Sequence, residues 1–451
     1  MTHNTDNTVI EDLLGLMDYS TCNFMAVDAV RRELADKGFI ELHEADKWEI
    51  KPQGKYYVVK NGSAIFAFVA GTVPAREAGF RIIAAHTDSP CFKLKPNCEI
   101  YGDGGVVSLN VEKYGGGIMY TWFDRPLSVS GRVMLRGASP LEPMEVLVNF
   151  DFPLATIPHL AIHFNRAVNE GNPLSVQKDM KPVIGYYSPE EIDRFKAEGG
   201  LIRRLLVDEL NEDREEQGLP AVAPDDILDY ELCLYPYEES SLVGANLEYI
   251  QSARIDDLSM AFAGLEALKA ECDTPAAATR VLALFDNEET GSGTKQGAAS
   301  PVLRHIAERV CAATSGDTQD LHRALARSFM ISADDAHGWH PNYNEKYDPT
   351  NHPVLGGGPV VKINANCKYM TDARGASVFN ALCREAGVNM QYFVNHADVA
   401  GGSTLGNISS SQLDIDGVDV GCAIWAMHSA RETAAVSDHL DMIKVFRQFL
   451  K

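Results

Sequence analysis

The chain has 451 residues, of which 45% are hydrophobic and 23% are charged, an ordinary globular composition that allows two or three domains with sizeable cores. Its formal net charge is −23, and a field of that sign repels nucleic acid and anionic membrane surfaces, so neither is expected as a partner. Nine cysteines without a Cys-x-x-Cys pair indicate free thiols, and with no signal-like N-terminus or long apolar run they favour a cytoplasmic protein.

The first ninety residues pass from a helical to an extended pattern. Apolar residues recur at helix-like intervals within residues 8–40. Two extended runs, 56–59 and 64–69, flank Asn61-Gly62, a dipeptide typical of a tight hairpin. The short apolar run 81–85 then predicts a buried strand that ends at His86.

Residues 93–235 differ in composition and in predicted secondary structure from the segments on both sides. They contain glycine clusters, short β-rich runs such as 127–135 and 145–149, and a polar, acidic stretch at 208–218. This segment interrupts an alternation of strands and helices, which indicates an inserted β-rich domain. We therefore predict a discontinuous main domain of residues 1–92 and 236–451, with a β-rich dimerisation or assembly domain of residues 93–235 between its parts.

After residue 240 strands and helices alternate again. The predicted strands are 281–285, 329–333, 359–363 and 422–425. The predicted helices are 258–269, 376–386 and 439–450. Such alternation favours an α/β fold with a mainly parallel sheet that helices cover on both faces. Ligand sites in these sheets form beyond the carboxyl ends of the strands.

Histidines and carboxylates stand at five predicted strand ends or in the loops next to them. They are His86-Thr-Asp88, Asp256-Asp257, Glu288-Glu289, Asp334-Asp335 with His337, and His428. A single residue of this kind is usually a cap or a solvated loop residue, but five in one α/β pattern predict a metal site. Imidazole and carboxylate ligands without thiolate suit zinc, manganese or cobalt in a catalytic site, and their number indicates two ions that share a carboxylate.

Two of these motifs have a chemical logic of their own. Two adjacent glutamates follow the buried run 281–285, and neighbouring carboxylates raise each other's pKa. The pair is explained if one glutamate is a metal ligand and the other accepts and donates a proton. A solvated strand end is the alternative. A carboxylate two residues after His86 can accept a hydrogen bond from the second ring nitrogen, whereas the alternative for Asp88 is to cap a turn before Pro90.

In order and spacing, these motifs resemble those of the M18 metallopeptidases, the relatives of aspartyl aminopeptidase and vacuolar aminopeptidase I. The resemblance spans nearly the whole chain and is carried by His86-Thr-Asp-Ser-Pro90, Arg254-Ile-Asp-Asp257, Asp286-Asn-Glu-Glu-Thr-Gly-Ser292, Ser332-Ala-Asp-Asp-Ala-His337, Gly401-Gly-Ser-Thr-Leu-Gly406 and Ala426-Met-His-Ser429. It implies that the main domain is a zinc-peptidase-like catalytic domain and that the protein is a cytoplasmic homo-oligomer, commonly a dodecamer, which acts on peptides.

The resemblance also implies a set of metal ligands. One ion would be held by His86 and Asp334, the other by Glu289 and His428, and Asp256 would bridge them. The implied cofactors are two divalent ions per subunit, zinc in the first instance, with cobalt and manganese as alternatives. Each of the neighbours Asp257 and Asp335 leaves the assignment beside it ambiguous.

Three further residues take catalytic roles by the same resemblance. Glu288 would be the general base, Asp88 would orient His86, and His159 would reach a neighbouring subunit's site and help to stabilise the oxyanion. The alternative for His159 and His163 is a pair of half-buried histidines. Their spacing mimics a helical zinc pair, but Pro158 precedes it and no glutamate follows His159.

The resemblance further implies that Lys362 contacts an acidic side chain at the first residue of the substrate, with His337 and Tyr369 as further pocket candidates. A chain at −23 repels acidic peptides at long range, so a preference for Asp or Glu needs a local cation. A solvent-facing lysine is the alternative. We predict an aminopeptidase for N-terminal Asp or Glu. The alternatives are a neutral-residue (Leu-type) aminopeptidase, an N-acyl amidohydrolase, and a non-catalytic assembly protein with a structural metal site.

Overall fold

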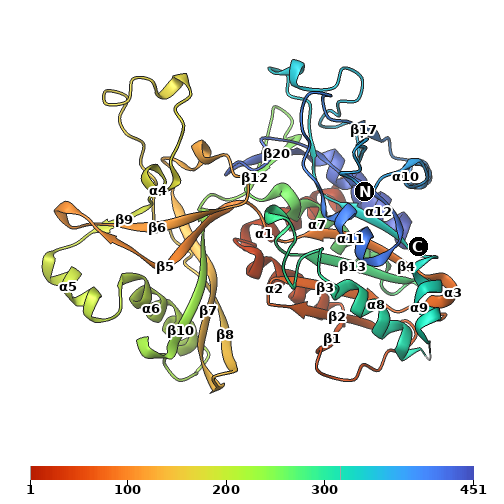
Figure 1. Cartoon of the computed structure of the whole chain (residues 1–451), viewed down its shortest axis with the longest axis horizontal. Coiled ribbons are helices and arrows are strands. Elements are labelled where there is room, and N and C mark those ends of the chain that lie inside the picture. The colour runs from red at the N-terminus through yellow and green to blue at the C-terminus, as the bar shows by residue number, and fades with distance from the viewer. Residues whose placement is uncertain (1, 315) are drawn as a thin grey trace. The chain divides into compact units, whose positions relative to one another are not determined.

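The computed structural model describes residues 2–314 and 316–451, and side chains from residue 8 onward (Figure 1). The chain forms two compact units. The first contains the residues up to Ser89, Ser240–Met427 and Arg431–Lys451, and the second contains Pro90–Glu239 and His428–Ala430. Among the described helices, none combines the length and the apolarity needed to cross a bilayer.

The first unit is built on a nine-stranded mixed sheet. In spatial order its strands are β1 (Ile40–Glu41), β2 (Lys55–Lys60), β3 (Ala64–Val69), β13 (Thr279–Phe285), β4 (Phe80–His86), β14 (Phe329–Ala333), β18 (Asp416–Gly421), β16 (Val360–Lys362) and β17 (Gln391–Phe393). The centre, from β13 to β18, is parallel, whereas β3 is antiparallel to both neighbours and β16 is antiparallel to β18. The sheet is therefore mixed, because the hairpin at Asn61-Gly62 and the reversed strand β16 add antiparallel pairs to a parallel centre.

Helices cover both faces of this sheet because its inner strands are apolar on both sides. Ile65 and Val69 of β3 lie in one core, and the intervening Phe66 and Phe68 lie in the other. The first core is closed by residues of α2 (Asn23–Asp36), α7 (Ile255–Glu271), α10 (Ala373–Ala386) and α12 (Val436–Leu450). The second is closed by α8 (Val302–Ala313), α9 (Thr318–Leu325) and α11 (Leu405–Leu413). The predicted helical stretch 8–40 overlaps α1 (Thr2–Tyr19) and contains α2, with a break between the two helices.

A separate five-stranded sheet in the first unit corrects one sequence-based expectation. It consists of β11 (Ser241–Val243), β12 (Tyr249–Ser252), β20 (Glu432–Ala435), β19 (Ala423–Trp425) and β15 (Ala336–His337). The predicted strand 422–425 is β19, so it does not belong to the main sheet. The place beside β14 is taken by β18, whose sequence mixes glycines and aspartates with two valines and so gives no continuous apolar signal.

The second unit has a six-stranded antiparallel sheet and two long helices. The strand order is β8 (Glu142–Asn149), β7 (Leu127–Ser139), β10 (Ile227–Pro236), β5 (Cys91–Tyr101), β6 (Val106–Tyr114) and β9 (Val183–Tyr186). Helix α5 spans Pro189–Ala197, and α6, Leu201–Glu216, buries Leu206 and Leu210 in the core of the unit. Most of the acidic stretch 208–218 thus belongs to α6. The sequence did not predict this helix, because its many charged residues indicated a polar interruption.

A histidine in α12 gives a prediction about stability and pH. His439 is 2% exposed, and neither of its ring nitrogens has a hydrogen-bond partner among the described residues. Burial lowers its pKa to about 3. In the unfolded chain the imidazole of residue 439 takes up a proton near pH 6.5, whereas the buried imidazole stays neutral down to about pH 3. The folded state therefore keeps its full stability above pH 6.5 and loses stability as the pH falls from 6.5 toward 3.

We therefore expect His439→Leu to stabilise the protein more at pH 5 than at pH 8. The difference between the two pH values should be about 2 kcal/mol, because the proton that only the unfolded chain binds is gone. Urea unfolding at the two pH values measures this difference, with His322→Leu on the exposed surface of α9 as the matched control. An equal effect of His439→Leu at both pH values would contradict the account.

Candidate metal centre

Three neighbouring strands of the main sheet bring acidic residues to one edge. Strand β4 ends at His86, and the next residues after β13 and β14 are Asp286 and Asp334. Phe285 of β13 is in register with His86, and the three strands are parallel, so their loops emerge at the same edge. The fourth contribution comes from the start of α7, where Asp256 and Asp257 precede the regular helix.

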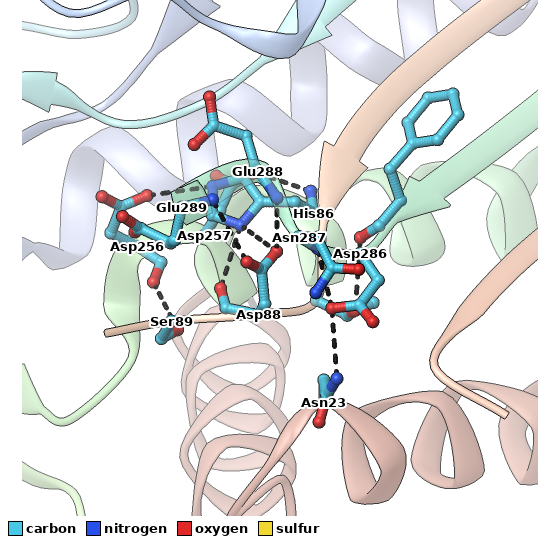
Figure 2. Close-up of polar contacts among 12 residues, drawn as sticks. Asn23, His86, Asp88, Ser89, Asp256, Asp257, Asp286, Asn287, Glu288 and Glu289 are labelled. Atoms are coloured by element: carbon cyan, nitrogen blue, oxygen red, sulfur yellow. Dashed lines mark hydrogen bonds and ion pairs between the residues drawn. The ribbon is translucent and has the colours of Figure 1, made fainter. Parts of the chain in front are cut away.

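Figure 2 shows His86, Asp256, Asp257, Glu288 and Glu289 lying close together. His86, Asp256, Asp257 and Asp334 each offer one ligand atom, and these atoms all lie within 4.8 Å of one another. A second group of the same kind consists of His86, Glu288 and Glu289. The Nε2 atom of His86 is 3.5 Å from Oδ1 of Asp256 and 4.0 Å from Oδ2 of Asp257. Folding thus places the predicted ligands of the first unit in two groups that share His86.

The donor set fits a divalent metal ion. It contains imidazole nitrogen and carboxylate oxygen without thiolate, which is the chemistry of catalytic zinc sites. The Oδ1 atom of Asp257 is buried and has no hydrogen-bond partner among the described residues. A buried carboxylate oxygen is costly unless a hydrogen bond or a cation satisfies it.

The protonation behaviour of the cluster reflects the same excess of negative charge. Burial raises the pKa of Glu288 well above its ordinary value, and the carboxylates of Asp334, Glu289 and Asp88 raise it further. Burial lowers the pKa of His86, but the surrounding carboxylates, with Asp257 foremost, outweigh burial and raise it well above 6.5. Since the cluster holds protons so strongly, a bound cation would compete with protons for the same oxygen and nitrogen atoms.

The backbone of Asp88, more than its carboxylate, orients His86. The Nδ1 atom of His86 is 2.9 Å from the carbonyl oxygen of Asp88 and 3.3 Å from its Oδ1. The expected partner was the carboxylate alone. With Nδ1 engaged in this way, Nε2 is the nitrogen that faces the aspartates at the start of α7.

The carboxylate of Asp88 instead fixes the glutamate pair. Its Oδ1 accepts the backbone N–H of Glu288 and its Oδ2 that of Glu289, both at 3.1 Å. Asn23 of α2 donates to Asp286 at 3.1 Å and ties the start of the same loop to the helix layer (Figure 2). Glu288 and Glu289 therefore sit on a backbone that hydrogen bonds hold from two directions.

The geometry distinguishes Asp334 from its neighbour. Both oxygens of Asp335 serve the fold: Oδ2 accepts from Ser259 Oγ at 2.7 Å, and Oδ1 accepts from the N–H of Cys422 at 3.2 Å. Asp334 belongs to the ligand cluster with His86. For the pair at α7 the distinction is weaker, because Oδ2 of Asp257 accepts from the N–H of His86 at 3.0 Å while the residue also belongs to the cluster.

Lys362 is buried beside this cluster. It is 3% exposed, its Nζ donates to the carbonyl of Asp335 at 3.1 Å, and it pairs with Oδ2 of Asp334 at 3.2 Å. The ring centroid of Tyr369, itself 7% exposed, is 5.5 Å from Nζ. The solvent-facing lysine considered as an alternative is therefore wrong. His337 is exposed on β15, and its ring lies 5.7 Å from that of Phe393.

The two other predicted site residues lie in the second unit. His159 lies in an irregular segment, where its Nδ1 is 2.7 Å from Oδ2 of Asp124 and its ring stacks on Phe123 at 3.8 Å. Without a helix, His159 and His163 do not form a helical zinc pair. His428 follows β19, and its carbonyl accepts from the N–H of Ile118 at 2.9 Å. The roles of His159 and His428 in the site stay predictions.

Sequence reasoning missed the residues that anchor the loops. Asn23 and Asp286 hold the glutamate loop, and Asp419, which is fully buried in β18, accepts from Thr404 Oγ1 at 2.7 Å. The latter bond ties the run Gly401–Gly406 to the main sheet. Asp419 follows Asp414 and Asp416 in a run of apolar residues and glycines, so nothing in the sequence distinguished it from them. Asp286 stands beside the glutamates, and the sequence predicted no role for it.

Comparisons with known proteins agree with this geometry. The family profile of "Aminopeptidase I zinc metalloprotease (M18)" matches residues 16–450. A probable M18 family aminopeptidase 2 of Clostridium novyi is 46% identical over 438 residues, which cover 97% of each chain. A solved complex of Ape4 and Nbr1 contains a chain with a TM-score of 0.94 and 33% identity, with 99% of this chain and 86% of that chain covered. A dodecamer of S. cerevisiae mApe1 matches with a TM-score of 0.84 and 26% identity, covering 99% and 97%.

Proposed function

The chain belongs to the M18 family of zinc metalloproteases and is a metallo-aminopeptidase, and within this class we propose that it removes N-terminal Asp or Glu residues from peptides with two metal ions per subunit. The observation that carries the metal part of the proposal is the cluster of His86, Asp256, Asp257 and Asp334 at the carboxyl edge of the parallel strands. It supplies more ligand atoms than one ion in a catalytic site needs.

In the proposed arrangement His86 and Asp334 would hold one ion, Glu289 and His428 would hold the other, and Asp256 would contribute to both. When bound, such ions polarise the scissile carbonyl and lower the pKa of water. Glu288 takes the proton of the attacking water on its carboxylate and returns it to the leaving amine. Two observations support this role for Glu288. Its backbone N–H donates to Asp88, which fixes the loop, and burial raises the pKa of its carboxyl group. Asp88 acts as a positioning residue for this loop and for His86.

The proposed preference for acidic residues rests on Lys362. An ammonium group has three N–H donors, and two partners, Asp334 and the carbonyl of Asp335, are present in the structure. In this proposal the third donor binds a carboxylate of the substrate. Burial lowers the pKa of Lys362, but Asp334, with Tyr369 and Asp419, outweighs burial and raises it, so the side chain stays a cation at a site that otherwise repels acids.

Lys362→Met is expected to lower the ratio of kcat/KM for Glu-p-nitroanilide to that for Leu-p-nitroanilide by about tenfold or more, because a charge-assisted hydrogen bond to the acidic side chain is lost. The ratio is the proper readout, since the variant also removes the partner of Asp334 and can lower both rates together. Lys368→Met, an exposed lysine on the following loop, is the matched control. An unchanged ratio in Lys362→Met would remove Lys362 from the specificity pocket.

We further propose that the second unit mediates assembly into a dodecamer, as in the S. cerevisiae mApe1 dodecamer, and that His159 serves a neighbouring subunit's site. The segment that follows His159 exposes three apolar side chains, Leu160 (59%), Ile162 (53%) and Phe164 (81%), which a neighbouring copy can cover. Light scattering should give a mass twelve times the chain's 49.4 kDa.

His159→Ala should lower kcat and leave this mass unchanged, because the backbone N–H of residue 159 still donates to Asp124. A loss of mass with His159→Ala would make the residue structural. A monomer with full activity would contradict both parts of the assembly proposal.

A further inference from the structure

A cavity lies in the first unit at the opposite end of the central strands from the metal centre. Its volume is about 500 Å³, and it is lined by parts of the segments 77–81 and 276–280, by Arg327 and by the last three residues of the chain. Strands β4 and β13 begin here, at Phe80 and Thr279, whereas the ligand cluster follows their other ends. Figure 1 shows α3 (Ala75–Ala78) and the C-terminus at this end of β4. The cavity is therefore separate from the site described above.

The charge of this cavity is opposite to that of the chain as a whole. Its lining contains Arg81, Arg280, Arg327 and Lys451, against one acidic side chain, Glu77. The whole chain has 40 lysines and arginines against 63 aspartates and glutamates. Within the part of the chain that the structure describes, none of these four cations forms an ion pair with a carboxylate.

Backbone carbonyls hold the arginines in place without neutralising them. Nη1 of Arg81 donates to the carbonyls of Phe80 at 3.3 Å and Arg327 at 3.1 Å, and its Nε and Nη2 have no partner among the described residues. Arg280 is 1% exposed; its Nη1 donates to the carbonyl of Glu271, its Nη2 donates to the carbonyl of Thr274 at 2.8 Å, and its buried Nε has no described partner. Burial lowers the pKa of both groups, but a guanidinium stays protonated at neutral pH.

We propose that this cavity binds a phosphate group through Arg81, Arg280 and Arg327. Arg280 is a buried cation without a counter-ion, which is costly, and an oxyanion bound beside it lowers that cost. Guanidinium groups with free N–H donors match the oxygens of a tetrahedral oxyanion, and carbonyl contacts hold all three arginines in advance. The volume also admits a larger molecule that carries the phosphate group. This proposal is independent of the peptidase assignment.

Thermal unfolding of the full-length protein tests the proposal, with inorganic phosphate, ADP and sodium chloride compared at equal ionic strength. We expect phosphate or ADP to raise the Tm relative to chloride, because a ligand of the native state stabilises it. ADP that binds more tightly than inorganic phosphate would identify an organic phosphate as the ligand, and equal affinities would identify free phosphate.

Arg327→Gln should weaken this binding roughly ten- to a hundredfold, because a charge-assisted hydrogen bond is lost. Arg327 is exposed, so the substitution should not disturb the fold. The Tm of the variant protein in sodium chloride shows whether it folds. The matched control is Arg323→Gln, which removes the same charge from a residue paired with Asp320 on α9. No Tm rise in the unmodified protein, or the same rise in both variants, would overturn the proposal; phosphate bound at the metal centre would give the latter result.

Discussion

Glu288→Gln is expected to lower kcat by about 10²- to 10⁴-fold while the metal content stays unchanged. Glutamine has nearly the same shape but cannot accept the proton of the attacking water. The backbone N–H of residue 288 still donates to Asp88, so the loop that also carries Glu289 keeps its position. Steady-state rates and metal analysis by mass spectrometry on the same preparation measure the two quantities.

Glu345→Gln, an exposed glutamate in the turn Asn344–Lys346, controls for the change in net charge. It should leave both quantities unchanged. Turnover that survives in Glu288→Gln would show that another group accepts the proton. Loss of metal together with turnover would make Glu288 a ligand instead of a base.

Substitution of the two aspartates after β14 is expected to have opposite consequences. Asp334→Asn should lower the metal content of the folded protein and reduce kcat/KM at least a hundredfold, because a ligand that belongs to the cluster is lost. Asp335→Asn should keep the metal and lower the free energy of unfolding by about 1–3 kcal/mol. An amide offers one oxygen, whereas Asp335 accepts from both Ser259 and Cys422.

Each variant serves as the control for the other, since both replace a carboxyl group with an amide at adjacent positions. Metal analysis and urea unfolding with chelator present separate ligand loss from fold destabilisation. If Asp335→Asn lost the metal and Asp334→Asn kept it, the ligand assignment at this strand end would be reversed.

Much of the main sheet was predictable because its strands are apolar on both faces. The runs at 281–285 and 329–333 correspond to β13 and β14, and Asn61-Gly62 forms the turn between β2 and β3. Polar residues at the ends of such strands stand out in the sequence. For this reason His86, Glu288 and Asp334 were identifiable, and the structure brings their loops to one edge.

Features that depend on tertiary pairing were not predictable. Strand β18 has too few apolar residues to be recognised, and only its place beside β14 makes it a strand. The difference between Asp334 and Asp335 depends on Ser259 and Cys422, which are distant in sequence. The burial of Lys362 depends likewise on its pairing with Asp334 at the end of another strand.

The most direct test of the central claim is the rate of release from Asp-, Glu- and Leu-p-nitroanilide by the purified protein. The rate is measured before chelation, after chelation, and after zinc, manganese or cobalt is restored to a measured stoichiometry. We predict release from the Asp or Glu substrate that is lost with the metal and returns fully only at two ions per subunit. Release from Leu alone would contradict the acidic preference, and activity that survives complete metal removal would contradict the metal mechanism itself.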